Sequence, residues 1–377
     1  MIRQAEERLS VALDATPLLG VPTGVGVFCA NAMAALGSQP AVRVEAFAVS
    51  WRRRHLLGAH VPEGVGLVGK AMPARPLHFA WRVADIPAIE HFIGAVDVVH
   101  GTNYVVPPAR RAARVVTVHD LTVIRYPEMC EPETLRFAGL VRRAIERGAW
   151  VHTPSRFVAD EVVAEFGADP QRVCVVHHGT PLLPSGRPGP TVTLPGKTTR
   201  YVLAVGTVEP RKDLLGLVGA FGQVAAHLGD VALVIAGPDG WGSDALASAI
   251  AQSPVGDRIV RTGFVADLNG LLRGAALLAY PSLYEGFGLP TLEAMAAGVP
   301  VVTTTAGALP EVVGDAASMV APGDTEALAA AIERLLEDAC ERQQLIERGL
   351  VRAAEFTWES CAEGLTDLYR AAAGDRR

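Results

Sequence analysis

The stretch PSLYEGFGLPTLEAMAAGVPVVTT, residues 281–304, decides how the chain is interpreted. An apolar run, Leu277–Tyr280, leads into it, and VPVVTT closes it. This order of apolar and turn-forming residues predicts a strand, a loop, a helix and a second strand. Two carboxylates with seven residues between them fall at the loop and the helix: Glu285 in the loop and Glu293 in the expected first turn of the helix.

A helix that begins after a strand presents free N–H groups and the positive end of its dipole to an anion. Carboxylates accept hydrogen bonds from sugar hydroxyls. Gly286 and Gly288 allow the backbone to approach a ligand closely. Together these features indicate a site for a nucleotide sugar, although Glu293 taken alone is also typical of an acid that only complements a helix dipole.

The length of 377 residues predicts two domains, and a net charge of −6 gives no general footprint for nucleic acid. The N-terminal MIRQAEERLS has no apolar core of a signal peptide. No Asp-x-Asp, zinc-spaced histidine–carboxylate set, P-loop or GxSxG occurs, so we expect no required metal, no cofactor and no nucleophilic serine. The scattered cysteines favour a reducing compartment; they are Cys29, Cys130, Cys174, Cys340 and Cys361.

Short β-branched runs alternate with helical segments along both halves of the chain, which predicts parallel sheets covered by helices. Within the first half, SRFVADEVVAEFG is expected to be a helix with Ser155 as N-cap and Gly167 as C-cap. The prediction is α/β, with two doubly wound domains. The boundaries are 1–181, a Pro/Gly-rich linker at 182–198, 199–355, and a last helical segment at 356–377. A ligand shared by both domains would lie beyond the carboxyl ends of the strands, in the cleft between them.

Three further groups carry charge or glycine at strand ends. Arg211 and Lys212 follow the strand YVLAVGT and suit a diphosphate. The loop at 22–26, PTGVG, opens a helix, and its glycines would let backbone amides approach a phosphate. His119 ends the strand VVTV, where it could bind a sugar hydroxyl or cap structure. Glu45 lies mid-strand, which leaves a dinucleotide oxidoreductase as a weak alternative.

Residues 51–85 are basic with interleaved apolar side chains, a pattern typical of a segment that docks on an anionic membrane or of a solvated face with snorkelling arginines. The basic residues are Arg52, Arg53, Arg54, Lys70, Arg75 and Arg82, against Glu63 and Asp85.

Taken together, EGFGLPTLE, VGTVEPRKDL, RIVRTGFV, TPSRFVADEVV, VCVVHHGT and FTWESCAEGL resemble the retaining glycosyltransferases of family 4, which have the GT-B fold. The resemblance covers nearly the whole chain. It implies transfer of a hexose from a nucleoside-diphosphate sugar to a hydroxyl acceptor in glycolipid or polysaccharide biosynthesis, without a metal ion. It also implies that the last helix crosses back to the first domain.

The resemblance implies roles for individual residues. The catalytic set would be His119, Arg211, Lys212 and Glu285. The donor would be bound by Gly24, Gly206, Thr207, Pro238, Gly263, Phe264, Val265, Gly286, Phe287, Gly288, Leu289, Thr291 and Glu293. Glu293 would bind the ribose and Thr291 the diphosphate, and the segment 263–265 with Pro238 would border the base.

The chain departs from the family at three positions. Thr207 stands where many relatives carry arginine, Asp213 where asparagine or glycine is common, and His178 where asparagine is common. These departures concern phosphate binding more than the class of reaction.

The favoured donor is GDP-mannose, with UDP-glucose and UDP-N-acetylglucosamine as alternatives. A sugar-nucleotide epimerase of the same fold and a non-catalytic nucleotide-sugar-binding protein also remain open. The expected partners are the donor, a glycan or lipid-linked acceptor and an anionic membrane surface, and no nucleic acid. The expected location is cytoplasmic, peripheral on the inner face of the membrane.

Overall fold

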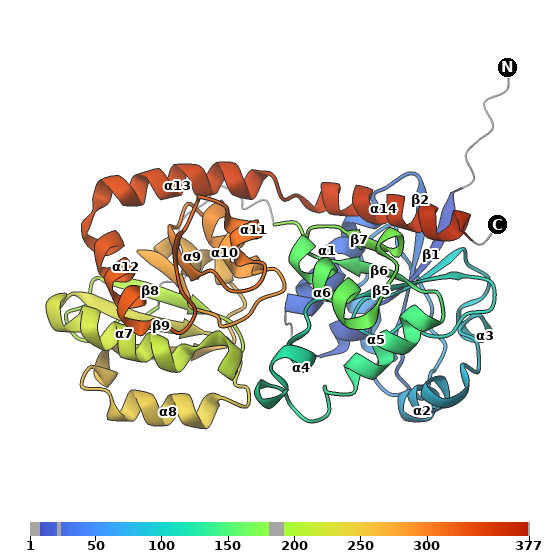
Figure 1. The fold of residues 1–377 in the computed structure, drawn as a ribbon, viewed down its shortest axis with the longest axis horizontal. Helices are drawn as coiled ribbons and strands as arrows, with labels where there is room; N and C mark the ends of the chain where they lie inside the picture. Colours follow the sequence, from blue (N-terminus) through green and yellow to red (C-terminus); the bar gives the residue numbers. More distant parts are fainter. Residues whose placement is uncertain (1–7, 21–23, 181–191, 376–377) are drawn as a thin grey trace, which may run out of the picture. The chain divides into compact units, whose positions relative to one another are not determined.

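The computed structural model describes residues 8–20, 24–180 and 192–375. The chain divides into two compact units (Figure 1). Unit 1 comprises Met1–Gly179 together with Thr357–Arg377, and unit 2 comprises Thr180–Phe356. Most of the expected linker at 182–198 lies outside the described residues; its last part, 192–198, precedes the first strand of unit 2.

Unit 1 is built on a parallel sheet of seven strands in the order β3-β2-β1-β4-β5-β6-β7. The strands are β1 (Leu9–Asp14), β2 (Val42–Phe47), β3 (Gly66–Leu67), β4 (Val98–Gly101), β5 (Ala113–Thr117), β6 (Trp150–Thr153) and β7 (Val173–Val175). The helices are α1 (Gly24–Gly37), α2 (Ala74–Ala84), α3 (Glu90–Ile93), α4 (Thr122–Arg125), α5 (Phe137–Glu146), α6 (Arg156–Phe166) and α14 (Trp358–Gly374).

Unit 2 has a second parallel sheet of six strands in the order β10-β9-β8-β11-β12-β13. Its strands are β8 (Arg200–Val205), β9 (Val231–Ala236), β10 (Ile259–Gly263), β11 (Leu277–Tyr280), β12 (Val301–Thr304) and β13 (Ser318–Val320). Its helices are α7 (Leu214–His227), α8 (Ser243–Gln252), α9 (Leu268–Gly274), α10 (Leu289–Ala296), α11 (Leu309–Val313), α12 (Thr325–Glu337) and α13 (Ala339–Ala354).

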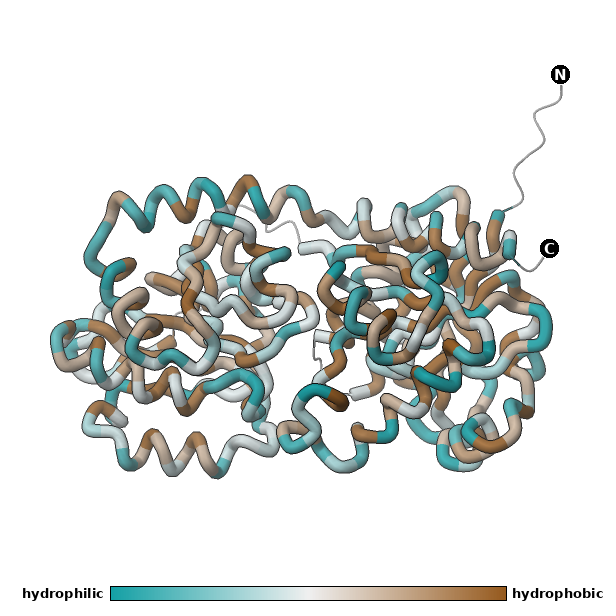
Figure 2. The backbone as a smooth tube through the Cα atoms, in the orientation of Figure 1, coloured by the Kyte–Doolittle hydropathy of each residue, from teal (hydrophilic) through white to brown (hydrophobic). Residues whose placement is uncertain are grey.

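Both faces of the unit 1 sheet are buried, as a parallel sheet requires. Val11 and Leu13 of β1 pack in a cluster with α1 and α14, whereas Ala12 between them packs in a cluster on the opposite face with α2. In unit 2, α7 and α12 pack against each other in the cluster that covers β8 and β9. Figure 2 shows that α13, by contrast, alternates between hydrophilic and hydrophobic residues.

The expected α6 is confirmed with both of its caps. The Ser155 side chain accepts a hydrogen bond from Val158 N, and Gly167 at the C-terminal end has φ +61°. The fold class is also confirmed, with two doubly wound parallel sheets and the strand order of the first sheet reversing at β1 and β4.

The chain returns to unit 1 after completing unit 2, and α14 packs on α1 and against β5 (Figure 1). Tyr369 of α14 is fully buried, and its hydroxyl lies 2.7 Å from Nδ1 of His100. Thr117 Oγ1 lies between two buried histidines, at 2.7 Å from His100 Nε2 and 2.9 Å from His152 Nδ1. The other ring nitrogen of His152, Nε2, lies 3.0 Å from the carbonyl oxygen of Val176.

The carbonyl of Val176 can only accept, so His152 Nε2 carries the proton there and Nδ1 accepts from Thr117. Thr117 then accepts from His100 Nε2, and His100 Nδ1 accepts from Tyr369. Burial lowers the pKa of His152 to about 3 and holds the pKa of His100 well below its ordinary value. Both rings are therefore neutral, and each donor in this chain of hydrogen bonds has one acceptor.

Candidate functional site

The site is built on the carboxyl ends of the unit 2 strands. β11 ends at Tyr280, and the loop that follows carries Glu285, whose carbonyl accepts from Ala308 N at 2.8 Å. A Cβ at Gly307, which has φ +58°, would meet that carbonyl oxygen at 2.2 Å. Because only glycine leaves this room, Gly307 allows the loop to lie against the start of α11 and fixes the backbone of Glu285.

Five side chains meet in a buried cluster at the carboxyl ends of β8 and β11. Lys212 Nζ donates to Glu285 Oε1 and to the Tyr280 hydroxyl, each at 2.6 Å, and Tyr280 donates to Glu285 Oε1 at 2.9 Å. Arg211 Nη1 lies 2.9 Å from Glu285 Oε2, and its Nη2 lies 2.5 Å from Glu209 Oε1. The side chains of Arg211, Lys212 and Glu285 are 14%, 11% and 7% exposed. Two cations are thus packed onto one carboxylate.

The charges in this cluster fix the protonation of its members. Burial would raise the pKa of Glu285, but the charges of Arg211 and Lys212 outweigh it and lower the pKa to about 2. Burial and the neighbouring Glu285 charge hold the pKa of Tyr280 well above its usual range. At neutral pH the cluster therefore contains an ionised carboxylate, a neutral phenol and the two cations.

Glu293 does not lie in the first turn of its helix, contrary to the expectation. α10 begins at Leu289, which places Glu293 in the second turn, and no acidic residue occupies the first. The first turn is filled by Pro290, which pre-sets the helical φ, and by buried Thr291. The carboxylate of Glu293 forms no hydrogen bond or ion pair with the residues that the structure describes, and burial raises its pKa to about 7. A carboxylate in this state lacks the partners that would stabilise its charge.

A glycine turn lies directly before α10. Gly288 is the N-cap with φ +98°, where a Cβ would meet Leu309 Cδ2 at 2.6 Å. Phe287 and Leu289 are buried beside it. The Thr291 hydroxyl is fully buried and donates to Gly288 O at 2.7 Å, so it stabilises the turn in this structure, and a phosphate contact from Thr291 stays a prediction.

The loops after β8 and β9 touch through their backbones. Gly206 N donates to Ala236 O at 2.9 Å, and a Cβ at Gly237 would meet Gly206 O at 1.9 Å. Val208, which follows Thr207, donates from its N–H to Pro238 O at 3.1 Å. The segment 263–265 comes next to these loops, since Gly237 N donates to Gly263 O at 2.9 Å. Most predicted donor residues are thus brought to one edge of the unit 2 sheet.

The structure explains why aspartate is tolerated at position 213, where asparagine or glycine is common in the family. Its φ is +47°, in the left-handed region that asparagine and glycine adopt most easily, and its side chain accepts from Gly216 N to cap α7. An aspartate satisfies both conditions.

Comparison with known proteins supplies the family. Residues 22–182 match the model described as Glycosyltransferase Family 4, and residues 199–338 match Glycosyl transferases group 1. An O-antigen chain mannosyltransferase B from Escherichia coli is 32% identical over 72% of this chain and 73% of its own. The chain belongs to glycosyltransferase family 4. A second family relative, an MMP alpha-(1->4)-mannosyltransferase from Mycolicibacterium hassiacum, is 31% identical over 79% of this chain and 75% of its own.

This family 4 glycosyltransferase also has solved structural neighbours. HepE of Anabaena, solved in complex with UDP-glucose, superposes with a TM-score of 0.72 at 19% identity, covering 97% of this chain and 100% of its own. At that identity the likeness concerns the fold, which is GT-B. The protein is therefore a glycosyltransferase with two Rossmann-like units.

In unit 1 of this glycosyltransferase, His119 follows β5 and is partly exposed. Its Nε2 lies 2.8 Å from the carbonyl oxygen of Thr102, which can only accept, so Nε2 carries the proton. Burial lowers the pKa of His119, so the ring is neutral and its Nδ1 is an acceptor. Phe28, one turn after Gly24 in α1, packs edge-on to the ring at 5.3 Å between centroids. Gly24 and His119 thus belong to one carboxyl edge, that of the unit 1 sheet.

A strained turn beside His119 was not predicted from the sequence. Tyr104 has φ +56°, and Val105 N donates to Asn103 O across it at 2.7 Å, which makes a γ-turn of the rare form. Gly101 makes the turn possible, since a Cβ there would meet Val105 O at 1.8 Å. A bulky residue in this conformation is costly and is typical of functional loops. The signal in the sequence was Gly101 at the end of β4.

The sequence likewise did not indicate that Tyr280 and Glu209 belong to the site, because a tyrosine in an apolar run predicts a core residue and a glutamate before a proline predicts a turn.

Within the described residues, no group of three or more His, Cys, Asp or Glu side chains is placed to hold a metal ion.

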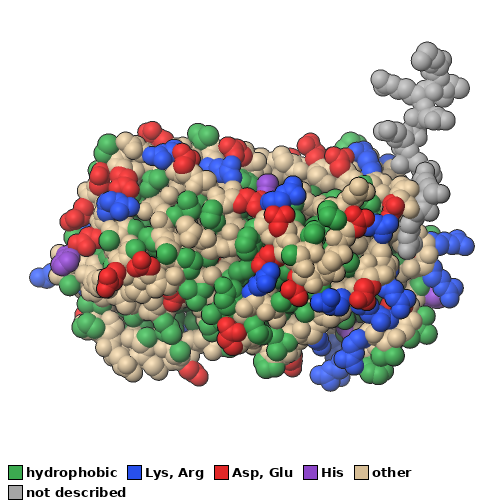
Figure 3. All heavy atoms as spheres, viewed as in Figure 1, with side chains coloured by type: hydrophobic (Ala, Val, Ile, Leu, Met, Phe, Trp, Pro, Cys, Tyr) green, Lys and Arg blue, Asp and Glu red, His purple; other side chains and the backbone are tan. Residues whose placement is uncertain are grey.

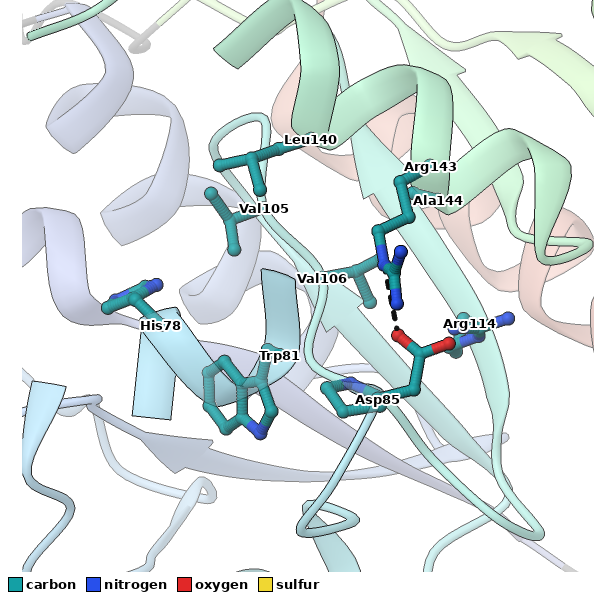
Figure 4. Close-up of a pocket in the computed structure, with 10 residues that line it drawn as sticks. His78, Trp81, Asp85, Val105, Val106, Arg114, Leu140, Arg143 and Ala144 are labelled. Carbon is teal, nitrogen blue, oxygen red and sulfur yellow. Dashed lines mark hydrogen bonds and ion pairs between the residues drawn. The ribbon is translucent and has the colours of Figure 1, made fainter. Parts of the chain in front are cut away.

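A narrow pocket elsewhere in unit 1 lies between α2, α5 and the segment after β4 (Figure 4). Trp81, Val105 and Leu140 form its apolar side. Arg143 crosses to Asp85, with 3.4 Å between Nε and Oδ1, at its polar end. None of the predicted donor residues lines it.

Proposed function

We propose that the protein transfers a hexose from a nucleoside-diphosphate sugar to a hydroxyl of a glycan or lipid-linked acceptor, with retention at the anomeric carbon and without a metal ion. The observation that carries the proposal is the buried cluster of Arg211 and Lys212 on Glu285. Two cations held at a strand edge beside the start of α10 suit a diphosphate leaving group.

The favoured donor is GDP-mannose, because two of the family relatives are mannosyltransferases. UDP-glucose is the second candidate, favoured by the fold neighbour whose structure holds it. UDP-N-acetylglucosamine is the third.

In the proposed reaction the diphosphate accumulates charge as the bond to the anomeric carbon breaks. Arg211, paired with Glu285 and Glu209, and Lys212, paired with Glu285, would share their N–H donors with the phosphate oxygens and stabilise that charge. Glu293 would accept hydrogen bonds from the ribose hydroxyls. His119, with an unprotonated Nδ1, would accept from a hydroxyl of the sugar and supply no proton. Departure on the same face as attack, assisted by the leaving phosphate, is the mechanism expected of the family.

We further propose that the protein works peripherally at the inner face of a membrane. On α2, Leu77 and Trp81 point into unit 1, whereas Phe79 and Val83 are both 61% exposed. Trp51 and Ile86 are 60% and 59% exposed in the same region. Figure 3 shows Lys and Arg side chains gathered over the α2 region of unit 1 among hydrophobic ones. Aromatic and cationic side chains on one surface suit an anionic bilayer. No helix within the described ranges combines the length and apolarity needed to cross a bilayer.

The experiment that tests the function measures release of nucleoside diphosphate from GDP-mannose, UDP-glucose and UDP-N-acetylglucosamine. Transfer requires acceptor for sustained release, an epimerase does not release diphosphate, and a sensor binds without turnover. With the donor that gives the fastest release, the double variant Arg211→Ala with Lys212→Ala should have a kcat about 100-fold or more below that of wild type. Arg348→Ala, which removes an exposed arginine of α13, is the control. Turnover within a few-fold of wild type in the double variant would show that the phosphate clamp is misplaced.

A further inference from the structure

The carboxyl ends of β9 and β10 carry an ion pair that the proposed reaction does not use. Asp239 lies in the loop after β9, and Arg261 lies in β10. Nη2 of Arg261 donates to Oδ1 of Asp239, and the Ser243 hydroxyl donates to the same oxygen at 3.2 Å. Ser243 accepts in turn from Gly240 N at 3.1 Å. The carboxylate is therefore fixed in orientation, although the side chain of Asp239 is 75% exposed.

Both members of the pair keep unused hydrogen-bonding groups. Among the described residues, Asp239 Oδ2 has no hydrogen-bond partner, and neither has Nη1 of Arg261. The pair thus presents carboxylate acceptors beside a guanidinium donor. An isolated surface ion pair contributes little to stability, so a stabilising role does not account for this arrangement.

The pair lies in line with the proposed diphosphate site. In the sheet, β10 and β9 are followed by β8, which leads to Arg211 and Lys212, and then by β11, which leads to Glu285. Neighbouring strands are about 4.8 Å apart, so the three steps from β11 to β10 span roughly 14 Å. A nucleotide sugar laid along this edge, with its sugar at β11 and its diphosphate at β8, has its base at β9 and β10.

The same end of the sheet offers surfaces for stacking. Phe264, directly after β10, is 52% exposed, and Trp241, in the loop after β9, is 45% exposed. Exposed aromatic side chains stack on bases of any identity. Selection among bases therefore falls to the polar groups between them.

Guanine is the base whose edge complements the pair. It presents two adjacent donors, N1–H and the 2-amino group, beside the acceptor O6. Adenine presents one amino group beside an acceptor nitrogen, and uracil a single N–H between two carbonyls. A carboxylate accepts two adjacent donors in a bidentate arrangement, and a guanidinium N–H can donate to the neighbouring oxygen.

We propose that Asp239 and Arg261 recognise the base of the donor and select guanine, with Asp239 accepting from N1–H and the 2-amino group and Arg261 donating to O6. This inference rests on the proposed function, because it assumes that Arg211 and Lys212 hold the diphosphate of the same ligand.

The test is calorimetric titration of the full chain with GDP, inosine diphosphate, UDP and ADP. Inosine diphosphate lacks only the 2-amino group of GDP. Wild type should bind GDP at least tenfold more tightly than the other three. Asp239→Asn should weaken the binding of GDP by about 10- to 100-fold and abolish the preference for GDP over inosine diphosphate. The reason is that the asparagine amide places an N–H donor opposite an N–H donor of the base. Arg261→Gln should weaken the binding of GDP and of inosine diphosphate equally, because both bases carry O6.

Asp244→Asn, the same change of charge five residues along in α8, is the matched control and should leave GDP affinity unchanged. The ratio of GDP to inosine diphosphate affinity is measured within one protein sample, so it does not depend on the fraction folded. Wild type that binds UDP or ADP best, or an Asp239→Asn variant that keeps the GDP preference, overturns the guanine inference and leaves the proposed function standing. Wild type that binds none of the four overturns the proposed function itself.

Discussion

Lys212 Nζ lies 2.6 Å from Glu285 Oε1, and both side chains are almost completely buried. Arg211 completes the arrangement from the other carboxylate oxygen, at 2.9 Å. Buried charges are costly to desolvate, and here each is compensated by its neighbours. The binding groups proposed for the donor are therefore held in place before any donor arrives, and the cations need not be reordered on binding.

Removal of the Glu285 carboxylate should destabilise unit 2. Glu285→Ala leaves Arg211 and Lys212 buried without their shared anion, and loss of one partner of a buried pair costs about 3–5 kcal/mol. Urea unfolding at neutral pH measures the change. Asp315→Ala removes an acid from an exposed pair with Arg348, at 3.7 Å, and should cost less than about 1 kcal/mol. Equal effects of the two substitutions would contradict the assignment of a buried cluster.

Glu293 should make the protein less stable as the pH rises. Its folded pKa of about 7 lies above the ordinary value of 4.5, so the folded state binds the proton more tightly than the unfolded state does. Stability from this group is full below about pH 4.5 and is lost as the pH rises to about 7. Glu293→Gln mimics the protonated acid and should be more stable than wild type by about 1 kcal/mol or more at pH 8, after allowance for partial exposure.

Thermal or urea unfolding at pH 8 and pH 4 tests this prediction, and the difference between Glu293→Gln and wild type should vanish at pH 4. The same variant should bind nucleoside diphosphates more weakly, because a neutral amide is a poorer acceptor for ribose hydroxyls. A variant less stable than wild type at pH 8 would show that the carboxylate has stabilising partners.

The Tyr369 hydroxyl should matter for the stability of unit 1. In Tyr369→Phe the ring remains packed, but Nδ1 of His100 loses its donor in a fully buried site. An unsatisfied buried group costs about 1–3 kcal/mol. Asp367→Ala, which removes an exposed acid from the same helix, is the control and should change stability by less than about 0.5 kcal/mol. Chemical unfolding of the two variants distinguishes a chain of hydrogen bonds from simple burial of the ring.

The α2 surface should be needed for membrane binding. Phe79→Asp and Val83→Asp together place two acids on the exposed face of α2 and should reduce sedimentation with anionic vesicles by at least tenfold at low salt. Val351→Asp, on the exposed face of α13 in unit 2, tests whether any exposed apolar residue has this effect. Wild type should also bind less as salt is added. Vesicle binding that is unchanged in the α2 variant and insensitive to salt would rule out this surface.

Much of the fold could be predicted because the strands are apolar runs that end in polar or glycine residues. The strand YVLAVGT became β8 and the helix after Ser155 became α6, since local patterns decide both. The beginning of α10 was displaced because proline is tolerated inside the first turn, so Pro290 indicated the region of the start but not the residue.

The residues of the candidate site could be predicted from the sequence, but the contacts between them could not. The spacing of Glu285 and Glu293 indicated carboxylates near a helix start, yet it said nothing of their different surroundings. Glu285 pairs with Lys212, 73 residues earlier in the chain, and with the adjacent Arg211, and this separation is closed only by the crossover from β8 to β11. The opposite shifts of their pKa values follow from this tertiary arrangement and have no signal in the local sequence.

The position of α14 has a consequence for synthesis. The helix that covers Val11 and Leu13 of the first strand begins at Trp358, after all of unit 2 has been translated. While the ribosome makes residues 180–356, the apolar surface of the nascent first unit lacks its cover and is open to aggregation or to chaperones. The first unit to emerge is therefore the last to be finished, and a stop codon shortly before Trp358 would leave its β1 surface uncovered even though every residue up to Gly179 had been made.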